Sequence, residues 1–275
     1  MQTQILGHVE LDATTLAHEL KMSESLTYAE PYDEFQCGRR PWRSRMLYAP
    51  GGEVGDGVLS HYDSSLPVRP TVHGEQLPHL KDVIEANFPK KHLLFARLVS
   101  MTESVLVPHR DLHVVAHRLH VPLRTSEQCL FLQENTVFRM LPGEVWSLDL
   151  TQMHSAAVMD RTDRVHLLLD FPGDAPVEDF IASPGGAEAS LADRTVPRPE
   201  MSESERRAAL DLARLIDSDN ITDVFAILIR KQFRRDGGAE FAWEALSAVA
   251  EKSRNPEVES YVRRLKAQCT LEDNG

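Results

Sequence analysis

Cysteine is scarce in this sequence, which has Cys37, Cys129 and Cys269 among its 275 residues. An odd number of widely spaced cysteines predicts neither a disulfide framework nor a zinc site, and fits a reducing, cytoplasmic location. Long hydrophobic runs are also missing, since no apolar stretch approaches the roughly 20 residues needed to span a bilayer. The first residues show no basic segment or apolar core, so we expect no signal peptide.

Positive charge is in deficit as well. The 42 acidic residues outnumber the 30 lysines and arginines, and the formal net charge is −12 at pH 7. Surfaces that bind nucleic acids or anionic membranes need the opposite sign, so we expect neither partner. The chain also has no P-loop and no Gly-rich dinucleotide fingerprint. Its length suits one large domain or a domain with an appendage.

The centre of the chain has short β-like runs separated by turn signals. They are Leu93–Val99, Ser104–Val107, Arg118–Leu123, Cys129–Gln133, Thr136–Met140, Glu144–Leu148, Ser155–Met159 and Val165–Phe171. Short strands at this spacing predict a closed or double-sheet architecture, a jelly roll or barrel. The fold class is therefore mainly β with α.

Helices are expected on both sides of this β core. A strand over 5–11 and a helix over 12–20 precede it, followed by an irregular segment over 30–75, typical of a functional loop or lid, and a helix over 77–88. Residues 1–183 are predicted to form the β domain and 184–199 a linker. Residues 200–275 are predicted to form a helical bundle. Its first helix is capped by Ser202 with Glu205 three residues on, and the others lie near 219–233, 237–252 and 255–268.

One ordered set of polar residues points to a metal. His109 and Asp111 form a His-x-Asp pair, and His154 follows much later. Residues two apart in a strand share a face, so both members of the pair can reach one ion. Two histidines and a carboxylate form the facial triad of non-haem iron(II) oxygenases. Arg164 comes ten residues after His154, where a second inward-facing group could hold a dicarboxylic co-substrate.

Alternation within two strands supports this interpretation. Arg118 and His120 share one face of their strand, opposite aliphatic residues, and Arg164 and His166 do the same in theirs. Charged residues on a buried face are costly without partners, which a metal and a bound dianion would supply. The fork of an arginine suits a carboxylate.

With these residues in place, the chain resembles the aspartyl/asparaginyl β-hydroxylase-type dioxygenases, and most of all the bacterial branch that hydroxylates free L-proline and related amino acids. The resemblance covers most of the chain. It rests on Arg97, Val107-Pro108-His109-Arg110-Asp111, Arg118-Leu119-His120, Phe138, Pro142-Gly143-Glu144-Val145-Trp146, Asp149, His154-Ser155-Ala156 and Arg164. Leu112-His113 departs from the pattern, because an aromatic residue is common there in the proline enzymes.

The resemblance implies a distorted double-stranded β-helix in which His109, Asp111 and His154 bind Fe(II). It implies that Arg164 holds the distal carboxylate of 2-oxoglutarate, with Arg118 and His120 as further co-substrate contacts. The implied reaction consumes O2, releases succinate and CO2, and is stimulated by ascorbate.

A free amino acid needs its own cation and its own acceptor. We expect Arg97 to bind the substrate carboxylate and either Asp33 or Asn135 to receive the ammonium. Within the irregular segment, Tyr32, Phe35 and Arg39 are expected to border the pocket as a cover that excludes water. L-proline or a ring homologue such as L-pipecolate is the first expectation for the substrate.

Three alternatives stay open on the sequence alone. A basic amino acid such as L-lysine could be the substrate, because acidic residues in the 30–34 loop could hold a second ammonium. A jelly-roll protein could use the same pocket to bind a ligand without turnover. A different cupin-type metalloenzyme, such as an isomerase, is the third, although such enzymes usually use more histidine ligands.

Overall fold

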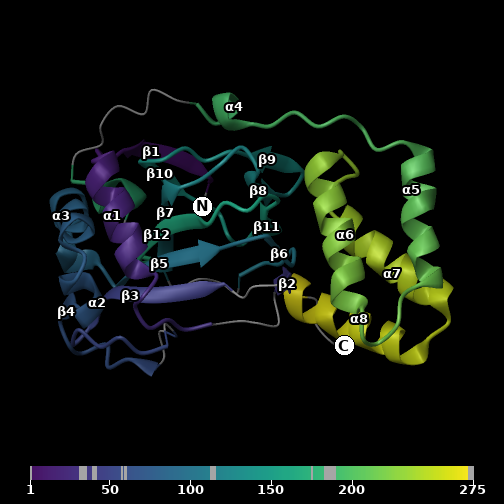
Figure 1. Ribbon diagram of the computed structural model, residues 1–275, viewed down its shortest axis with the longest axis horizontal. Helices are drawn as coiled ribbons and strands as arrows, with labels where there is room; N and C mark the ends of the chain where they lie inside the picture. Colours follow the sequence, from purple (N-terminus) through teal and green to yellow (C-terminus); the bar gives the residue numbers. More distant parts are fainter. Residues whose placement is uncertain are drawn as a thin grey trace.

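Two antiparallel sheets lie face to face in the centre of the molecule (Figure 1). The computed structural model describes residues 2–30, 36–38, 42–56, 58, 61–111, 116–174, 176–182 and 190–271. Within these ranges the larger sheet has the order β1-β10-β7-β12-β5-β3-β4 and the smaller one β2-β6-β11-β8-β9. This arrangement confirms the predicted jelly-roll core.

The strands of the larger sheet are β1 (Gln4–His8), β3 (Arg43–Pro50), β4 (Val68–Pro70), β5 (Phe95–Met101), β7 (Ala116–Arg124), β10 (Glu144–Ser147) and β12 (Arg164–Pro172). Those of the smaller sheet are β2 (Gln36–Gly38), β6 (Ser104–Leu106), β8 (Cys129–Gln133), β9 (Thr136–Phe138) and β11 (His154–Val158). The central runs predicted from alternation therefore form strands close to the expected bounds.

The described helices lie around this β core. They are α1 (Ala13–Ser23), α2 (Val72–Glu75), α3 (Pro78–Asn87), α4 (Leu191–Arg194), α5 (Glu203–Leu210), α6 (Ile221–Arg234), α7 (Phe241–Ser253) and α8 (Pro256–Thr270). Short 3-10 turns occupy Lys90–His92, Val177–Phe180 and Asp211–Arg214. Asp12 caps α1 and Ser202 forms a capping box with Glu205 on α5, as the sequence predicts.

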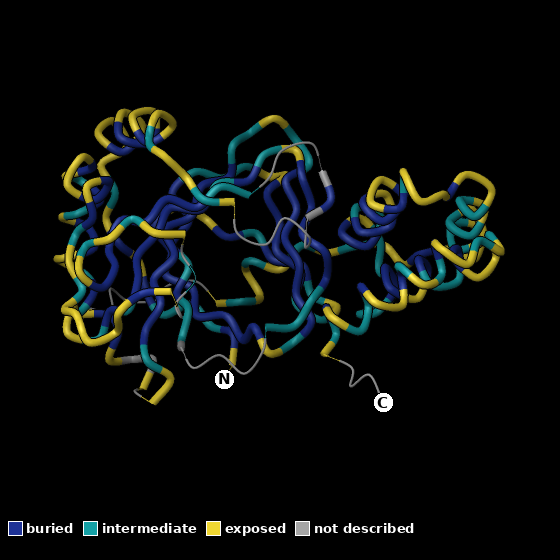
Figure 2. Tube along the Cα trace, turned by 90° about the horizontal axis from the view of Figure 1, so that it is seen from below, coloured by how far each residue is buried: buried dark blue, intermediate teal, exposed yellow. Residues whose placement is uncertain are grey.

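Three apolar clusters explain the layers. The first joins α1 and α3 to the outer face of the larger sheet, through residues such as Leu16, Ile84 and Leu167. The second lies between the sheets. The third joins the outer face of the smaller sheet to α6, α7 and α8, so the C-terminal helices share a core with the β domain. Figure 2 shows the strands largely buried and the exposed residues concentrated on helices and loops.

The prediction of an irregular segment over 30–75 is wrong where that segment forms strands and a short helix. Residues 43–50 form β3, which pairs with β5 on one side and β4 on the other. Short elements at 36–38, 68–70 and 72–75 flank it. From Ser44 to Pro50 every residue of β3 is buried, so the period-two alternation that reveals a half-exposed strand is missing.

Residues 190–199, in the second half of the predicted linker, pack closely against the β domain. Ser190 caps α4, and the chain that follows runs along β9. Arg139 donates its backbone N–H to Arg194, and Val196 donates to Val137, both at 2.8 Å. Among the described residues no helix is long and apolar enough to cross a membrane.

Candidate functional site

The two histidines of the predicted triad meet through backbone pairing. His109 follows β6 and forms an antiparallel bridge with His154, the first residue of β11. Their reciprocal N–H···O=C bonds are 3.0 and 2.9 Å long, and the ring centroids are 4.2 Å apart. Asp111 is fixed by a 2.9 Å bond from its N–H to the carbonyl of Leu150. The fold therefore brings three side chains from two chain segments to one point.

The donor atoms of these residues fit a small metal ion. One ligand atom from each of His109, Asp111 and His154 lies within 4.8 Å of the others. The Nδ1 atoms of His109 and His154 lie 2.8 and 3.0 Å from the backbone carbonyls of Val107 and Gln152. Nδ1–H donation to these carbonyls orients each ring and leaves the Nε2 lone pair for a metal.

The charge states suit a divalent cation. Burial, followed by the proximity of His109, lowers the pKa of His154 to about 3, so this imidazole is neutral at physiological pH. Burial raises the pKa of Asp111, but the contact with His109 and the charge of Arg118 outweigh it, and the net pKa lies below its usual range. The site therefore offers two imidazole nitrogens and one carboxylate, the donor set of a non-haem iron centre.

The C-terminal helices support the loop that carries His109 and Asp111, the first two residues of the predicted triad. The indole N–H of Trp243, on α7, donates to the carbonyl of Pro108 at 2.9 Å. The backbone N–H of Arg110 donates to the carbonyl of Cys269, on α8, at 2.8 Å. The loop between these contacts holds His109, so the helical region fixes this predicted ligand from outside the β core.

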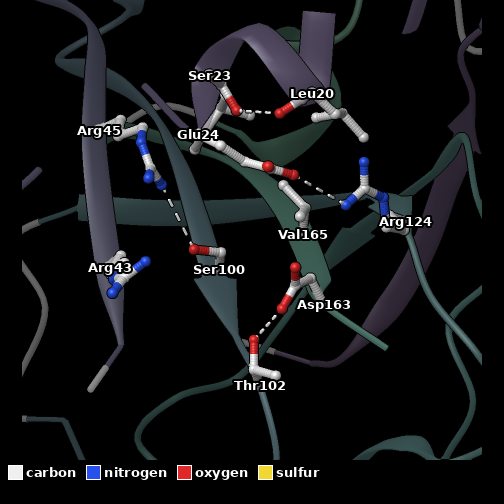
Figure 3. A pocket seen from close by; sticks show the side chains of 11 residues that line it. Leu20, Ser23, Glu24, Arg43, Arg45, Ser100, Thr102, Arg124, Asp163 and Val165 are labelled. Atoms are coloured by element: carbon white, nitrogen blue, oxygen red, sulfur yellow. Dashed lines mark hydrogen bonds and ion pairs between the residues drawn. The ribbon is translucent and has the colours of Figure 1, made fainter. Parts of the chain in front are cut away.

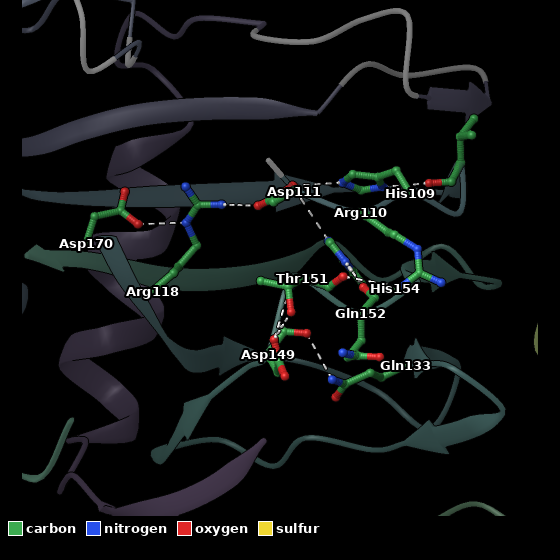
Figure 4. Close-up of polar contacts among 11 residues, drawn as sticks. His109, Arg110, Asp111, Arg118, Gln133, Asp149, Thr151, Gln152, His154 and Asp170 are labelled. Carbon is green, nitrogen blue, oxygen red and sulfur yellow. Dashed lines mark hydrogen bonds and ion pairs between the residues drawn. The ribbon is translucent and has the colours of Figure 1, made fainter. Parts of the chain in front are cut away.

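A chain of buried and half-buried ion pairs leads from the triad to β12 and β5, and Figure 4 shows its part from Asp111 through Arg118 to Asp170. Arg118 lies 3.3 Å from Asp111 through Nη1 and 2.7 Å from Asp170 through Nε. Arg97 contacts the other oxygen of Asp170 at 3.3 Å. Asp170 was not among the residues expected from sequence, although it follows Arg164 and His166 on the same face of β12. Extending that alternation by four residues would have found it.

Arg164 has a different environment. Its side chain is buried, with 5% of the residue exposed, and Nη2 lies 3.2 Å from His166 Nδ1 while Nη1 lies 3.7 Å from the Met101 sulfur. Within the described ranges no carboxylate pairs with it. Burial lowers its pKa to about 10, which leaves the guanidinium charged at neutral pH. A buried cation without a counter-ion is costly, so this position is suited to an anionic ligand.

His120 also has unsatisfied polar atoms. Neither ring nitrogen has a hydrogen-bond partner in the described part of the chain. Burial and the charge of Arg164 hold the pKa of His120 well below its usual range, so the ring is neutral. His120 can therefore donate one hydrogen bond and accept another from a bound ligand or water.

These groups open into one cavity of about 520 Å³ between the two sheets. Its walls are Trp42, Arg97, Val99, Met101, Leu106, His109, Arg110, Asp111, Arg118, His120, Phe131, Leu150, His154, Ala156, Arg164, Leu168, Gln268 and Leu271. The triad and the predicted arginines 97, 118 and 164 thus line a single space. Apolar side chains form most of the remaining wall.

Several residues of this wall were missed by sequence reasoning. Trp42 lies within the segment 30–75 that was predicted to be irregular, and Gln268 and Leu271 come from the end of α8, far from the motifs. Nothing local in the sequence marks the end of α8 as part of a pocket. Only the docking of the helical region onto the β core brings it there.

Not every predicted site residue reaches the cavity. Asn135, in the turn between β8 and β9, donates to Asp236 at 2.8 Å and accepts from Arg198 at 2.9 Å. It is absent from the cavity wall, so the structure gives it a role in joining that turn to the helical region, in place of the predicted contact with the substrate ammonium. Asp33, Arg39, Tyr32 and Phe35 lie outside the described residues.

Known proteins share both halves of this architecture. The profile described as Aspartyl/Asparaginyl beta-hydroxylase matches residues 9–173, and the one described as L-proline 3-hydroxylase, C-terminal, matches residues 178–272. An L-proline cis-4-hydroxylase from Rhizobium meliloti (strain 1021) is 28% identical over 261 residues, which cover 93% of this chain and 91% of that protein. L-proline cis-3-hydroxylase 2 from a Streptomyces species is 31% identical over 246 residues, covering 86% and 83% respectively. Among solved structures, a Pseudomonas putida prolyl-4-hydroxylase aligns with a TM-score of 0.38 and 10% identity over 63% of this chain and 93% of that chain, a likeness too weak to carry an argument.

Proposed function

Because this chain belongs to the aspartyl/asparaginyl β-hydroxylase family, we propose that it is an iron(II)- and 2-oxoglutarate-dependent dioxygenase that hydroxylates a free L-amino acid. The observation that carries the proposal is the combination within one cavity of a His-Asp-His donor set and the buried Arg164, which has no carboxylate partner among the described residues. The donor set suits iron(II), and Arg164 suits the far carboxylate of a dicarboxylic co-substrate.

His109, Asp111 and His154 would hold the metal, and the open face of this triad would take the co-substrate. When bound, iron(II) supplies the oxygen-activating chemistry that couples oxidative decarboxylation of 2-oxoglutarate to conversion of C–H into C–OH. One atom of O2 enters succinate and the other enters the hydroxyl group, with CO2 released. Arg164 orients the co-substrate through its two-pronged guanidinium, and His120 offers a further hydrogen bond beside it.

The ion-pair chain prepares the rest of the cavity for an amino acid. Arg97 and Arg118 share Asp170, which holds both guanidinium groups in place before the substrate arrives. With Arg164 assigned to the co-substrate, Arg97 is the cation proposed for the substrate carboxylate. Preorganised groups of this kind lower the entropy lost on binding.

The wall of the cavity favours a cyclic apolar substrate over a basic one. Its described part contains one carboxylate, Asp111, and this residue is committed to the metal. The second ammonium of L-lysine would therefore be left among apolar side chains such as Leu106, Phe131 and Leu168, at a high desolvation cost. The ring methylenes of L-proline or L-pipecolate suit the same surface, and we propose L-proline or this homologue as the substrate.

The proposal is tested by incubating the full chain with iron(II), 2-oxoglutarate, ascorbate and one free amino acid at a time. Mass spectrometry should show one added oxygen on L-proline or L-pipecolate, dependent on 2-oxoglutarate. Oxygen added to L-lysine alone would refute the substrate class, and no product from any amino acid would refute the activity. Arg97→Ala should raise KM for the amino acid while leaving KM for 2-oxoglutarate nearly unchanged. Arg214→Ala, at a side chain that is 79% exposed, is the matched control.

A further inference from the structure

A second, smaller cavity lies on the opposite face of the larger sheet, under the end of α1 (Figure 3). Its volume is about 180 Å³. It is lined by Leu20, Ser23, Glu24, Arg43, Arg45, Leu98, Ser100, Thr102, Arg124, Asp163 and Val165. None of these residues lines the cavity that holds the His-Asp-His triad, called the metal cavity below. Strand alternation sends Arg97 and Arg164 to that cavity's face of the sheet, and Leu98 and Val165 to the opposite face.

The most unusual group in this cavity is Arg45. The residue is 4% exposed, yet no ion pair involves it in the described chain, and its Nε has no hydrogen-bond partner there. Its guanidinium has one long hydrogen bond, 3.5 Å from Nη1 to Ser100 Oγ, and lies 5.4 Å from the centre of the Tyr28 ring. Buried cations are normally paired, and neither contact supplies a negative charge.

Arg43, two residues before Arg45 on β3, adds a second positive charge beside it. Arg43 stacks on the same ring, with its guanidinium carbon 4.5 Å from the Tyr28 centroid, and its buried Nε also lacks a partner in the described ranges. Burial, and secondly the positive charge of Arg43, lower the pKa of Arg45. Two guanidinium groups side by side repel each other unless an anion lies between or beside them.

The two carboxylates of the cavity wall form no ion pair with Arg43 or Arg45 among the described residues. Glu24 is 3.8 Å from Arg124, and its side chain is 60% exposed to solvent. Asp163 accepts a hydrogen bond from the hydroxyl of Thr102. With three arginines and two carboxylates in the wall, the cavity keeps an excess positive charge, centred on β3.

We propose that this cavity is a binding site for a small oxyanion of the phosphate class, held by Arg45 and Arg43 with Arg124 at the rim. Guanidinium groups donate paired hydrogen bonds to phosphate oxygens, and Ser100 can add a hydroxyl donor. The cavity is smaller than the roughly 300–1,000 Å³ of pockets that take drug-sized molecules, so the ligand is a free ion or a single phosphate group. The site is separate from the metal cavity and does not depend on the proposed hydroxylation.

Thermal unfolding and titration calorimetry of the full chain test this, with inorganic phosphate as the probe and sodium chloride at equal ionic strength as the reference. Phosphate should raise the Tm of the wild type more than chloride does. In Arg45→Met we expect this increment to disappear and the Kd for phosphate to rise at least about tenfold, because a direct charge-assisted contact is lost. Without phosphate, Arg45→Met should unfold no earlier than the wild type, since a buried charge that has no ion pair in the described part of the chain has been removed. Arg214→Gln, at an exposed arginine elsewhere, should keep the full increment.

Variants outside this cavity and a second set of anions establish where the phosphate binds and in what form. Arg164→Met should retain the phosphate increment; loss of the increment there but not in Arg45→Met would place the anion in the metal cavity and overturn the proposal. If Arg45→Met does not fold, Arg124→Gln at the rim should weaken phosphate binding instead. A response to glycerol phosphate as strong as that to inorganic phosphate would identify a phosphate monoester as ligand, and a response to inorganic phosphate alone would identify the free ion. A response to succinate without one to phosphate, or no response beyond ionic strength, would refute the assignment.

Discussion

Asp170 joins two arginines of the metal cavity, and its replacement by asparagine tests whether the ion-pair chain organises the site. Asp170→Asn keeps the shape of the side chain but removes the charge. Arg118, whose side chain is 21% exposed, would keep Asp111 at 3.3 Å, whereas Arg97, with 5% of its side chain exposed, would lose the charge of Asp170 beside it. The repulsion between them would no longer be offset.

Breaking a buried pair by removing one partner costs about 3–5 kcal/mol, because the remaining charge stays buried. Asparagine can still accept a hydrogen bond, and Arg118 reaches some solvent. We therefore expect a loss of about 2–4 kcal/mol in the free energy of unfolding. In a chain of this size that is a fall of roughly 5–10 °C in Tm.

Thermal unfolding followed by circular dichroism measures this directly. Glu127→Gln is the matched control, because Glu127 pairs with Arg139 at 3.5 Å with 82% of its side chain exposed. Such surface pairs contribute at most about 1 kcal/mol, so the control should unfold close to the wild type. If Asp170→Asn and Glu127→Gln have the same Tm, the ion-pair chain does not stabilise the cavity as argued.

Three further predictions address the co-substrate, the helical region and pH. Arg164→Lys keeps the charge but loses the planar pair of donors, so KM for 2-oxoglutarate should rise about tenfold or more; an unchanged KM would place the dicarboxylate elsewhere. Trp243→Phe keeps the packed ring but removes the donor to Pro108, so calorimetry should show weaker metal binding, with about 1 kcal/mol lost in unfolding free energy; equal metal affinity would contradict the support role. Burial and the charge of Arg164 hold the pKa of His166 well below its usual range, so His166 is neutral in the folded protein. In the unfolded chain the same imidazole takes up a proton below about pH 6.5. The free energy of unfolding therefore falls as the pH drops below that value. His166→Gln should remove about 2 kcal/mol of the loss between pH 7 and pH 5 in urea unfolding, and an unchanged pH dependence would show that His166 is not the group responsible.

Local patterns account for the parts of the fold that sequence predicted well. Strands such as β7 and β12 alternate aliphatic with polar residues, because one face packs under α1 and α3 and the other faces the cavity. Strand β3 was missed since it is buried on both faces and lies within a segment, 30–75, that is rich in Gly, Pro and charged residues. Its place in the sheet depends on pairing with β5, about 50 residues later, which no local pattern records.

The site divides in the same way. The cluster of His109, Asp111 and His154 could be predicted because the side chains that suit a metal are restricted to a few residue types. Asn135 was placed at the substrate although its partners, Asp236 and Arg198, are 101 and 63 residues away in the sequence. Contacts of that range depend on how the helical region docks. The same docking brings the end of α8 into the cavity wall, which sequence reasoning could not show.

Incubation under ¹⁸O₂ with iron(II), 2-oxoglutarate and L-proline is the decisive measurement of the proposed activity, because it follows both atoms of the oxidant. We predict that hydroxylated product and succinate form in equal amounts, that succinate gains one ¹⁸O, and that the hydroxyl group also derives from O2. Asp111→Ala should form neither product. Hydroxylation without succinate, or full turnover by Asp111→Ala, would contradict the assignment of this cavity as the dioxygenase site.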